Sequence, residues 1–85
     1  MPAARKEAVQ IRFEILEHLY YSPEPEPRTH VWRRATSMSY DDFRKHLSYL
    51  ITKGLIFEDK DGNCIISSQG RRIYEELRRV LPSIL

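Results

Sequence analysis

Residues 39–56, SYDDFRKHLSYLITKGLI, contain an amphipathic helix with characteristic residues at both ends. Ser39 is a good N-cap, and Asp42 at the third helical position completes an arrangement like a capping box. Gly54 stands where a left-handed C-terminal cap belongs, so the pattern predicts a helix over 40–53. Its apolar stripe contains Phe43, Leu47, Leu50 and Ile51. Its opposite, polar face contains Tyr40, Asp41, Arg44, Lys45, Ser48 and Tyr49.

The residues just before this helix predict a shorter one. Thr29 is a suitable N-cap for a helix over 29–35, with Trp32 among its apolar residues. Residues 36–38, Thr-Ser-Met, then form a turn. Residues 29–53 are therefore predicted to be a helix-turn-helix, in which the large ring of Trp32 belongs to the core.

Another amphipathic helix is predicted at the N-terminal end, over residues 4–21. Its apolar stripe contains Ala8, Ile11, Ile15 and Leu19, while Glu7, Glu14, Glu17 and His18 are expected to face water. Pro23 ends the helix, because a residue before proline avoids the helical region. Residues 22–27, Ser-Pro-Glu-Pro-Glu-Pro, are predicted to be a stiff, extended connector, since alternating prolines neither continue a helix nor donate to a β-ladder.

After Gly54 the pattern changes from helix to strand. The β-prone runs 55–59 and 64–67 are joined through Lys60-Asp61-Gly62-Asn63, and Asp-Gly between such runs predicts a hairpin whose two central residues have positive φ. The apolar residues are consecutive, so the sequence leaves open which face of each strand is buried. Ser67 caps a last helix over 68–81, which Pro82 stops.

Helix, short helix, turn, helix, hairpin and helix is the order of a winged helix-turn-helix domain. The predicted fold class is mainly α with a β-hairpin wing (α+β), as a single domain over residues 1–85. In this arrangement the short helix braces the longer one, whose polar face is narrow enough for a DNA major groove of about 12 Å. The hairpin of residues 55–67, the wing, reaches alongside.

The chain also resembles the small archaeal winged-helix DNA-binding proteins. The resemblance is carried by IRFEILEHL (11–19), THVWRRA (29–35), SYDDFRKHLSYLITKGLI (39–56) and SSQGRRIYEEL (67–77). It implies DNA binding, and dimerisation through a C-terminal coiled coil in some members. Three features depart from the family pattern: the proline-rich connector, the two acidic residues Asp41 and Asp42, and a last helix that Pro82 makes too short for a long coiled coil.

Composition favours a binding protein over an enzyme. The 85 residues are 41% hydrophobic and 31% charged, and no apolar run approaches the roughly 18 residues of a membrane span. Net charge is only +2, but residues 28–53 hold six Lys/Arg against two Asp. A single cysteine, Cys64, cannot form an internal disulfide, which favours a reducing cytoplasm; it is interpreted as a buried small hydrophobe, with redox activity left open. No cofactor, small-molecule substrate or catalytic residue is expected, and the histidines lack metal-like spacing.

The candidate DNA-binding residues lie in three places: the start of helix 29–35, the polar face of helix 40–53, and the wing. On the polar face, Arg44 is expected to read guanine and Lys45 to neutralise phosphate. The open alternative for that face is a solvated surface with an Asp41–Arg44 pair. The full set is Arg28, Thr29, Ser39, Tyr40, Arg44, Lys45, Ser48 and Lys60.

These observations predict a double-stranded DNA-binding protein of the cytoplasm, associated with the nucleoid. It would be a transcriptional regulator or a small chromosome-associated protein that reads the major groove with helix 40–53. The alternative is a winged-helix module for protein–protein interaction, with Asp41 and Asp42 marking a surface not meant for DNA. A homodimer through the first and last helices is expected from the apolar tail Leu81, Ile84 and Leu85.

Overall fold

The computed structural model describes residues 7–84, with side chains up to residue 80. The elements are α1 (Ala8–Tyr20), β1 (Glu26–Pro27), α2 (Arg28–Ala35), α3 (Tyr40–Thr52), β2 (Ile56–Glu58), β3 (Asn63–Ile66) and α4 (Ser68–Ile84). This order is that of a winged helix-turn-helix, α+β as predicted, with one additional short strand.

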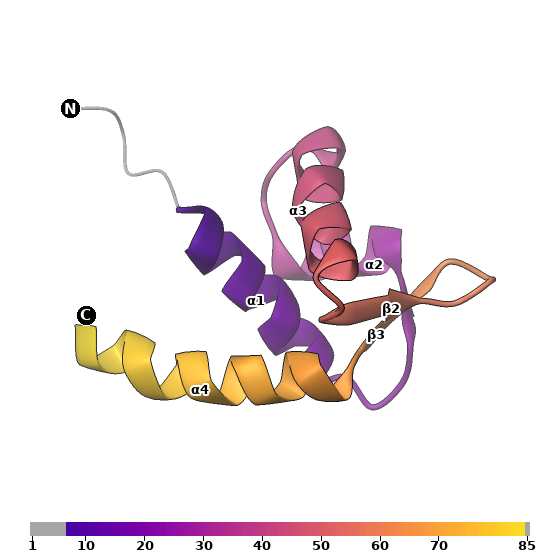
Figure 1. Ribbon diagram of the computed structural model, residues 1–85. Helices are drawn as coiled ribbons and strands as arrows, with labels where there is room; N and C mark the ends of the chain where they lie inside the picture. Colours follow the sequence, from indigo (N-terminus) through magenta and orange to yellow (C-terminus); the bar gives the residue numbers. More distant parts are fainter. Residues whose placement is uncertain (1–6, 85) are drawn as a thin grey trace.

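Helix α1 lies at the centre of the fold and contacts each of the other three helices. The hairpin of β2 and β3 projects to one side, and α4 crosses beneath α1 (Figure 1). The four helices and the hairpin contribute to one apolar core, because each buries apolar side chains in it. The core includes Ile15, Leu16 and Leu19 of α1, Val31 of α2, Phe43, Leu47 and Leu50 of α3, Ile56 and Cys64 of the hairpin, and Tyr74 of α4.

Helix α1 starts later than predicted. Glu7 is extended and precedes the first helical residue, Ala8, while the predicted residues 4–6 lie outside the described part of the chain. Side chains expected to face water are instead engaged, Glu14 among them through a 3.0 Å hydrogen bond from the Gln10 amide. Glu17 accepts a 2.8 Å hydrogen bond from the hydroxyl of buried Tyr74, and His18 contacts Glu26 of the connector.

The proline-rich connector is also part of the sheet. Glu26 and Pro27 form β1, which pairs with β3 in an antiparallel register of Glu26 with Cys64 and Pro27 with Asn63. The expectation that this segment stays outside the ladder was wrong. Strand β1 is at the edge of the order β1-β3-β2, where a proline lacking an N–H is tolerated.

The hairpin register settles which face of the wing is buried. Ile56 pairs with Ile66 and both are buried, whereas Phe57 pairs with Ile65 and both are exposed. The predicted two-residue turn is wrong in one respect, since Gly62 alone among residues 59–62 has positive φ, at 83°. Residues 59–62 connect the strands, and a hydrogen bond from the Asp59 N–H to the Asn63 carbonyl closes a loop of three residues, 60–62.

Helix α4 continues through Pro82 to Ile84, so the predicted stop at Pro82 was wrong. A proline within a helix removes one backbone hydrogen bond, and here this does not end the helix. Its first turn is closely packed on the wing, where Ser67 caps it through a 2.9 Å hydrogen bond from the Gly70 N–H. A Cβ on Gly70 would lie 2.2 Å from the carbonyl oxygen of Leu55.

Candidate nucleic-acid interface

The polar face of α3 is exposed as predicted for Arg44, Lys45 and Ser48. It points away from the core because the opposite face of α3 carries Phe43, Leu47 and Leu50, which are almost wholly buried. Gly54, with φ of 76°, ends the helix in the left-handed conformation expected there. We call Arg44, Lys45 and Ser48 the polar face of α3.

Both cations of this face are available to a ligand. Arg44 has no hydrogen-bond or ion-pair partner within the described residues, so the expected alternative of an Asp41–Arg44 pair is not formed. Lys45 is 80% exposed, and its Nζ lies 4.0 Å from a carboxylate oxygen of Asp42. A pair this exposed contributes little free energy, so a phosphate can displace it.

Ser39 is the N-cap of α3. Its hydroxyl oxygen accepts a 3.2 Å hydrogen bond from the backbone N–H of Asp42. Only this half of the expected capping box is present, since the nearest described partner of the Asp42 carboxylate is Lys45. Asp41 and Asp42 both lie in the first turn, where the positive end of the helix dipole stabilises them.

Tyr40 is less exposed than the sequence predicts. Its ring packs edge-on to Trp32 of α2 at a centroid distance of 5.2 Å, and stacks with Phe43 at 6.0 Å. The indole N–H of Trp32 donates a 2.7 Å hydrogen bond to the carbonyl of Met38. The three rings fix the angle between α2 and α3, which makes Tyr40 part of the packing between the two helices, and Trp32 packs against the core as expected.

Arg28 joins the helix-turn-helix to the wing. Its guanidinium donates from Nε at 2.8 Å, and also from Nη2, to the carboxylate of Glu58 on β2. The hydrogen bonds to Glu58 raise the pKa of Arg28. Arg28 is also the first residue of α2, with Pro27 as N-cap, so the expected cap at Thr29 is wrong and Thr29 lies exposed in the first turn.

The tip of the wing carries Lys60 between two acidic residues. Lys60 and Asp61 are exposed. Asp59 is occupied within the loop, because its carboxylate accepts hydrogen bonds from the backbone N–H groups of Asp61 and Asn63, both at 2.9 Å. These bonds, that from Asn63 first, lower the pKa of Asp59. Negative charge therefore persists beside Lys60 across the neutral pH range.

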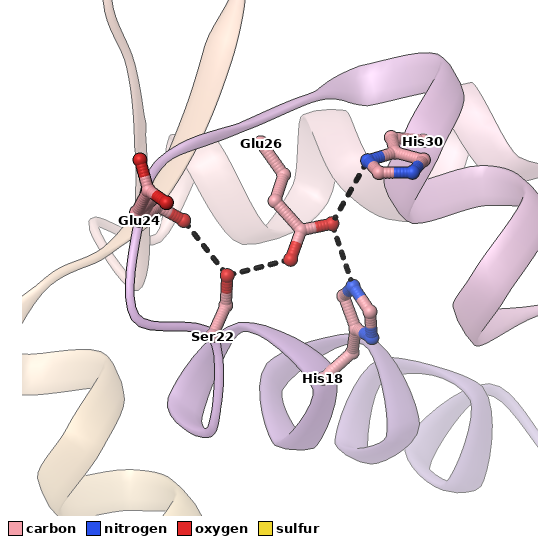
Figure 2. Close-up of polar contacts among 5 residues, drawn as sticks. All are labelled: His18, Ser22, Glu24, Glu26 and His30. Carbon is pink, nitrogen blue, oxygen red and sulfur yellow. Dashed lines mark hydrogen bonds and ion pairs between the residues drawn. The ribbon is translucent and has the colours of Figure 1, made fainter.

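A polar cluster absent from the sequence-based candidates holds the connector against the helices (Figure 2). The carboxylate of Glu26 contacts Nε2 of His18 at 2.9 Å, Nδ1 of His30 at 3.5 Å and the hydroxyl of Ser22 at 2.5 Å. Burial acts to raise the pKa of Glu26, but the hydrogen bonds from Ser22 and His18 outweigh it and lower that pKa. The i,i+4 spacing of Glu26 and His30 was the only sequence signal for this cluster.

An open cavity of about 550 Å³ lies next to this cluster, between the end of α1 and α2. Its lining is mixed in charge, with Glu14, Glu17, Glu26, His18 and Arg34 among the residues.

Within residues 7–84, no three His, Cys, Asp or Glu side chains are arranged to hold a metal ion. No helix in that part of the chain is long and apolar enough to cross a membrane.

Cys64 faces the core. It is fully buried on β3, and burial raises the pKa of its thiol to about 11. At neutral pH the group is therefore a protonated, inaccessible thiol, which supports its interpretation as a small core hydrophobe.

Comparison with known proteins assigns the chain to a family. A family model described as winged helix-turn-helix matches residues 5–83. The matched range includes α1, the wing and almost all of α4. No curated protein and no solved structure matches the chain significantly.

Proposed function

Because the chain belongs to the winged helix-turn-helix family, we propose that it binds double-stranded DNA with α3 in the major groove. The observation that carries this proposal is the polar face of α3. Arg44 is unpaired there among the described residues, Lys45 is held only by a weak surface pair, and both stand on a helix fixed by a fully buried opposite face. We further propose that the protein acts in the cytoplasm as a transcriptional regulator or a small chromosome-associated protein.

Each side chain of the face has a distinct role in this proposal. Arg44, one turn into α3, reads a guanine through two parallel hydrogen bonds. Lys45 and Ser48 contact phosphate and fix the register of the helix. Lys60 is a secondary phosphate contact, weakened by Asp59 and Asp61. Arg28 is not included, since Glu58 already occupies its guanidinium.

Competition binding of duplex DNA at two salt concentrations tests the proposal. Arg44→Ala should reduce discrimination at one base pair, by roughly 1–3 kcal/mol. Lys45→Ala should weaken binding to all sequences alike and reduce the log–log salt slope by about one. Arg72→Ala on α4 removes the same charge from an exposed site on another helix, and should leave binding unchanged.

A second function is favoured by a specific observation, the two exposed carboxylates of Asp41 and Asp42 at the start of α3. They repel a phosphate backbone, and suit a surface that docks another protein. If the Arg44 and Lys45 variants bind duplex DNA as the parent does, α3 is not the DNA-reading helix and this second function takes precedence. Asp41→Asn separates the two further, since it should raise non-specific DNA affinity only if α3 faces phosphates.

We also propose a homodimer formed through α1 and α4. The start of α1 and the end of α4 lie on the same side of the molecule (Figure 1), and each carries an exposed valine, Val9 and Val80. The side chains of the predicted apolar tail, residues 81–85, lie outside the described part. Light scattering should give twice the monomer mass of 10.1 kDa, and Val80→Glu should return it to the monomer value. A monomeric parent protein would refute the dimer.

A further inference from the structure

A cluster of two cations and one aromatic ring joins α1 to the C-terminal half of α3. The guanidinium carbon of Arg12 lies 3.6 Å from the centroid of the Tyr49 ring, and the Nζ of Lys53 lies 5.5 Å from the same centroid. Tyr49 is 39% exposed and Lys53 is exposed. The ring thus holds two positive charges beside solvent, and we call these residues the Arg12–Tyr49–Lys53 cluster.

The positive charge of this cluster has no counter-ion among the described residues. Neither Arg12 nor Lys53 forms an ion pair with any described residue, and the buried Nε of Arg12 has no hydrogen-bond partner there. A partly buried cation with an unsatisfied donor is costly unless another group compensates it. The cation–π contact with Tyr49 offsets only part of that cost. An anion bound at the cluster would offset the rest.

A neighbouring histidine reports the same excess of positive charge. His46 of α3 also has a buried ring nitrogen, Nδ1, without a partner in the described structure. Burial lowers the pKa of His46, the charge of Arg12 lowers it further, and the charge of Asp42 acts in the opposite direction without restoring it. The positive charge of Arg12 therefore disfavours protonation of the His46 ring.

We propose that Arg12, Tyr49 and Lys53 form a binding site for one phosphate of the DNA backbone. This inference rests on the proposed function, because it extends the contact surface of α3 by one turn. Tyr49 follows Ser48 directly, and Lys53 lies one turn beyond Tyr49, so the cluster continues the polar face toward the end of the helix. Arg12 adds a contact from α1.

The chemistry of the cluster matches a phosphate diester. A guanidinium supplies two parallel N–H donors to phosphate oxygens, and an ammonium and a phenol hydroxyl each supply one more. Stacking on Tyr49 holds the plane of the Arg12 guanidinium in advance, which reduces the entropy lost on binding. None of these residues lines the open cavity beside Glu26, and Tyr49 and Lys53 are both exposed, so a phosphate of an extended polymer can reach the cluster from solvent.

The first test is the salt dependence of binding to a short duplex of random sequence. Arg12→Gln removes the charge, whereas Arg12→Lys retains it without the planar fork. Each lost phosphate contact reduces the log–log salt slope by about 0.9. When salt rises from roughly 50 to 200 mM, the factor by which affinity falls should therefore be about 3.5 times smaller for Arg12→Gln than for the parent. Arg12→Lys should keep the parent slope, and Lys53→Gln, at an exposed position, should reproduce the Arg12→Gln result without affecting the core.

The second test is the titration of His46, followed by NMR. A bound phosphate offsets the charge of Arg12, so duplex DNA should raise the pKa of His46 in the parent protein. In Arg12→Gln that pKa should already be raised without DNA and should change less on binding. Inorganic phosphate at the same phosphate concentration should have little effect; an equal effect would overturn the assignment to the DNA backbone.

The outcomes separate this inference from the function on which it rests. If Arg12→Gln and Lys53→Gln keep the parent affinity and slope while Arg44→Ala and Lys45→Ala weaken binding, the phosphate site is refuted and DNA binding by α3 stands. If none of the four variants changes binding, the proposed function itself fails. Arg72→Gln, an equal charge change on α4, controls for net charge and should match the parent.

Discussion

Substitution of Gly70 by alanine should destabilise the domain, although helix propensity alone favours alanine. Gly70 is buried in the first turn of α4, directly against Leu55, the residue that begins the wing. An alanine Cβ would meet the Leu55 carbonyl oxygen at 2.2 Å, whereas ordinary contacts begin near 3.4 Å. The difference, 3.4 minus 2.2, means that α4 must move by about 1.2 Å.

That movement acts on three hydrogen bonds that converge at Ser67. The Ser67 N–H donates to the Leu55 carbonyl at 3.0 Å, its hydroxyl donates to the Gly54 carbonyl at 2.7 Å, and the Gly70 N–H donates to that hydroxyl at 2.9 Å. Each contributes roughly 1 kcal/mol net, about 3 kcal/mol together. The higher helix propensity of alanine offsets about 0.5–1 kcal/mol of this, so the free energy of unfolding should fall by about 2 kcal/mol.

Thermal unfolding followed by circular dichroism measures this loss. For a domain of this size about 2 kcal/mol corresponds to a Tm lower by roughly 8–16 °C. Glu76→Ala, at an exposed position of the same helix, is the control and should change stability by no more than about 0.5 kcal/mol. A Tm for Gly70→Ala equal to or above that of the parent would refute the argument, because it would mean that α4 does not need to approach the wing so closely.

Three further predictions follow from buried or paired groups. The pKa of Glu26 is lowered in the folded protein, so its carboxylate contributes stability above the ordinary carboxyl pKa and loses it as pH falls through the folded value; the difference in Tm between the parent and Glu26→Gln should shrink between about pH 7 and pH 3. The Cys64 thiol, with its pKa raised to about 11, should resist a thiol reagent in the native protein and react after unfolding in urea; rapid native labelling would contradict its burial. A double-mutant cycle with Arg28→Met and Glu58→Gln should give a coupling free energy of about 0.5–1 kcal/mol, and a value of zero would show that the pair does not connect α2 to the wing.

The parts of the fold that the sequence predicts well are those specified by nearby residues. Helix α3 was predicted to within one residue, because Ser39 and Gly54 act through local backbone geometry that needs no tertiary context. The same holds for the exposure of Arg44 and Lys45, which follows directly from the spacing of the buried residues on the other face of the helix.

The differences arise where distant residues meet. No local pattern shows that Arg28 faces Glu58, thirty residues later, or that Glu26 pairs with a strand near Cys64. The exposure of Tyr40 was mispredicted for a related reason. Its side chain lies at the boundary between the polar and apolar faces of α3, where it packs against the neighbouring helix α2. The periodicity of apolar residues distinguishes the buried face of a helix from its exposed face, but it does not show where a neighbouring helix covers part of the exposed face.

The pairing of β1 with β3 has a consequence for the order of folding events. Its two residue pairs join positions that are 38 and 36 residues apart, 26 with 64 and 27 with 63, so closing this contact costs more chain entropy than closing the hairpin itself. The hairpin and the helices consist mainly of contacts between residues close in sequence, so they can form earlier. Strand β1 can pair only after β3 has formed. The connector should therefore acquire its native geometry last and release it first. In hydrogen exchange the backbone amides that form the β1–β3 ladder should lose protection before those of the α1–α3 core.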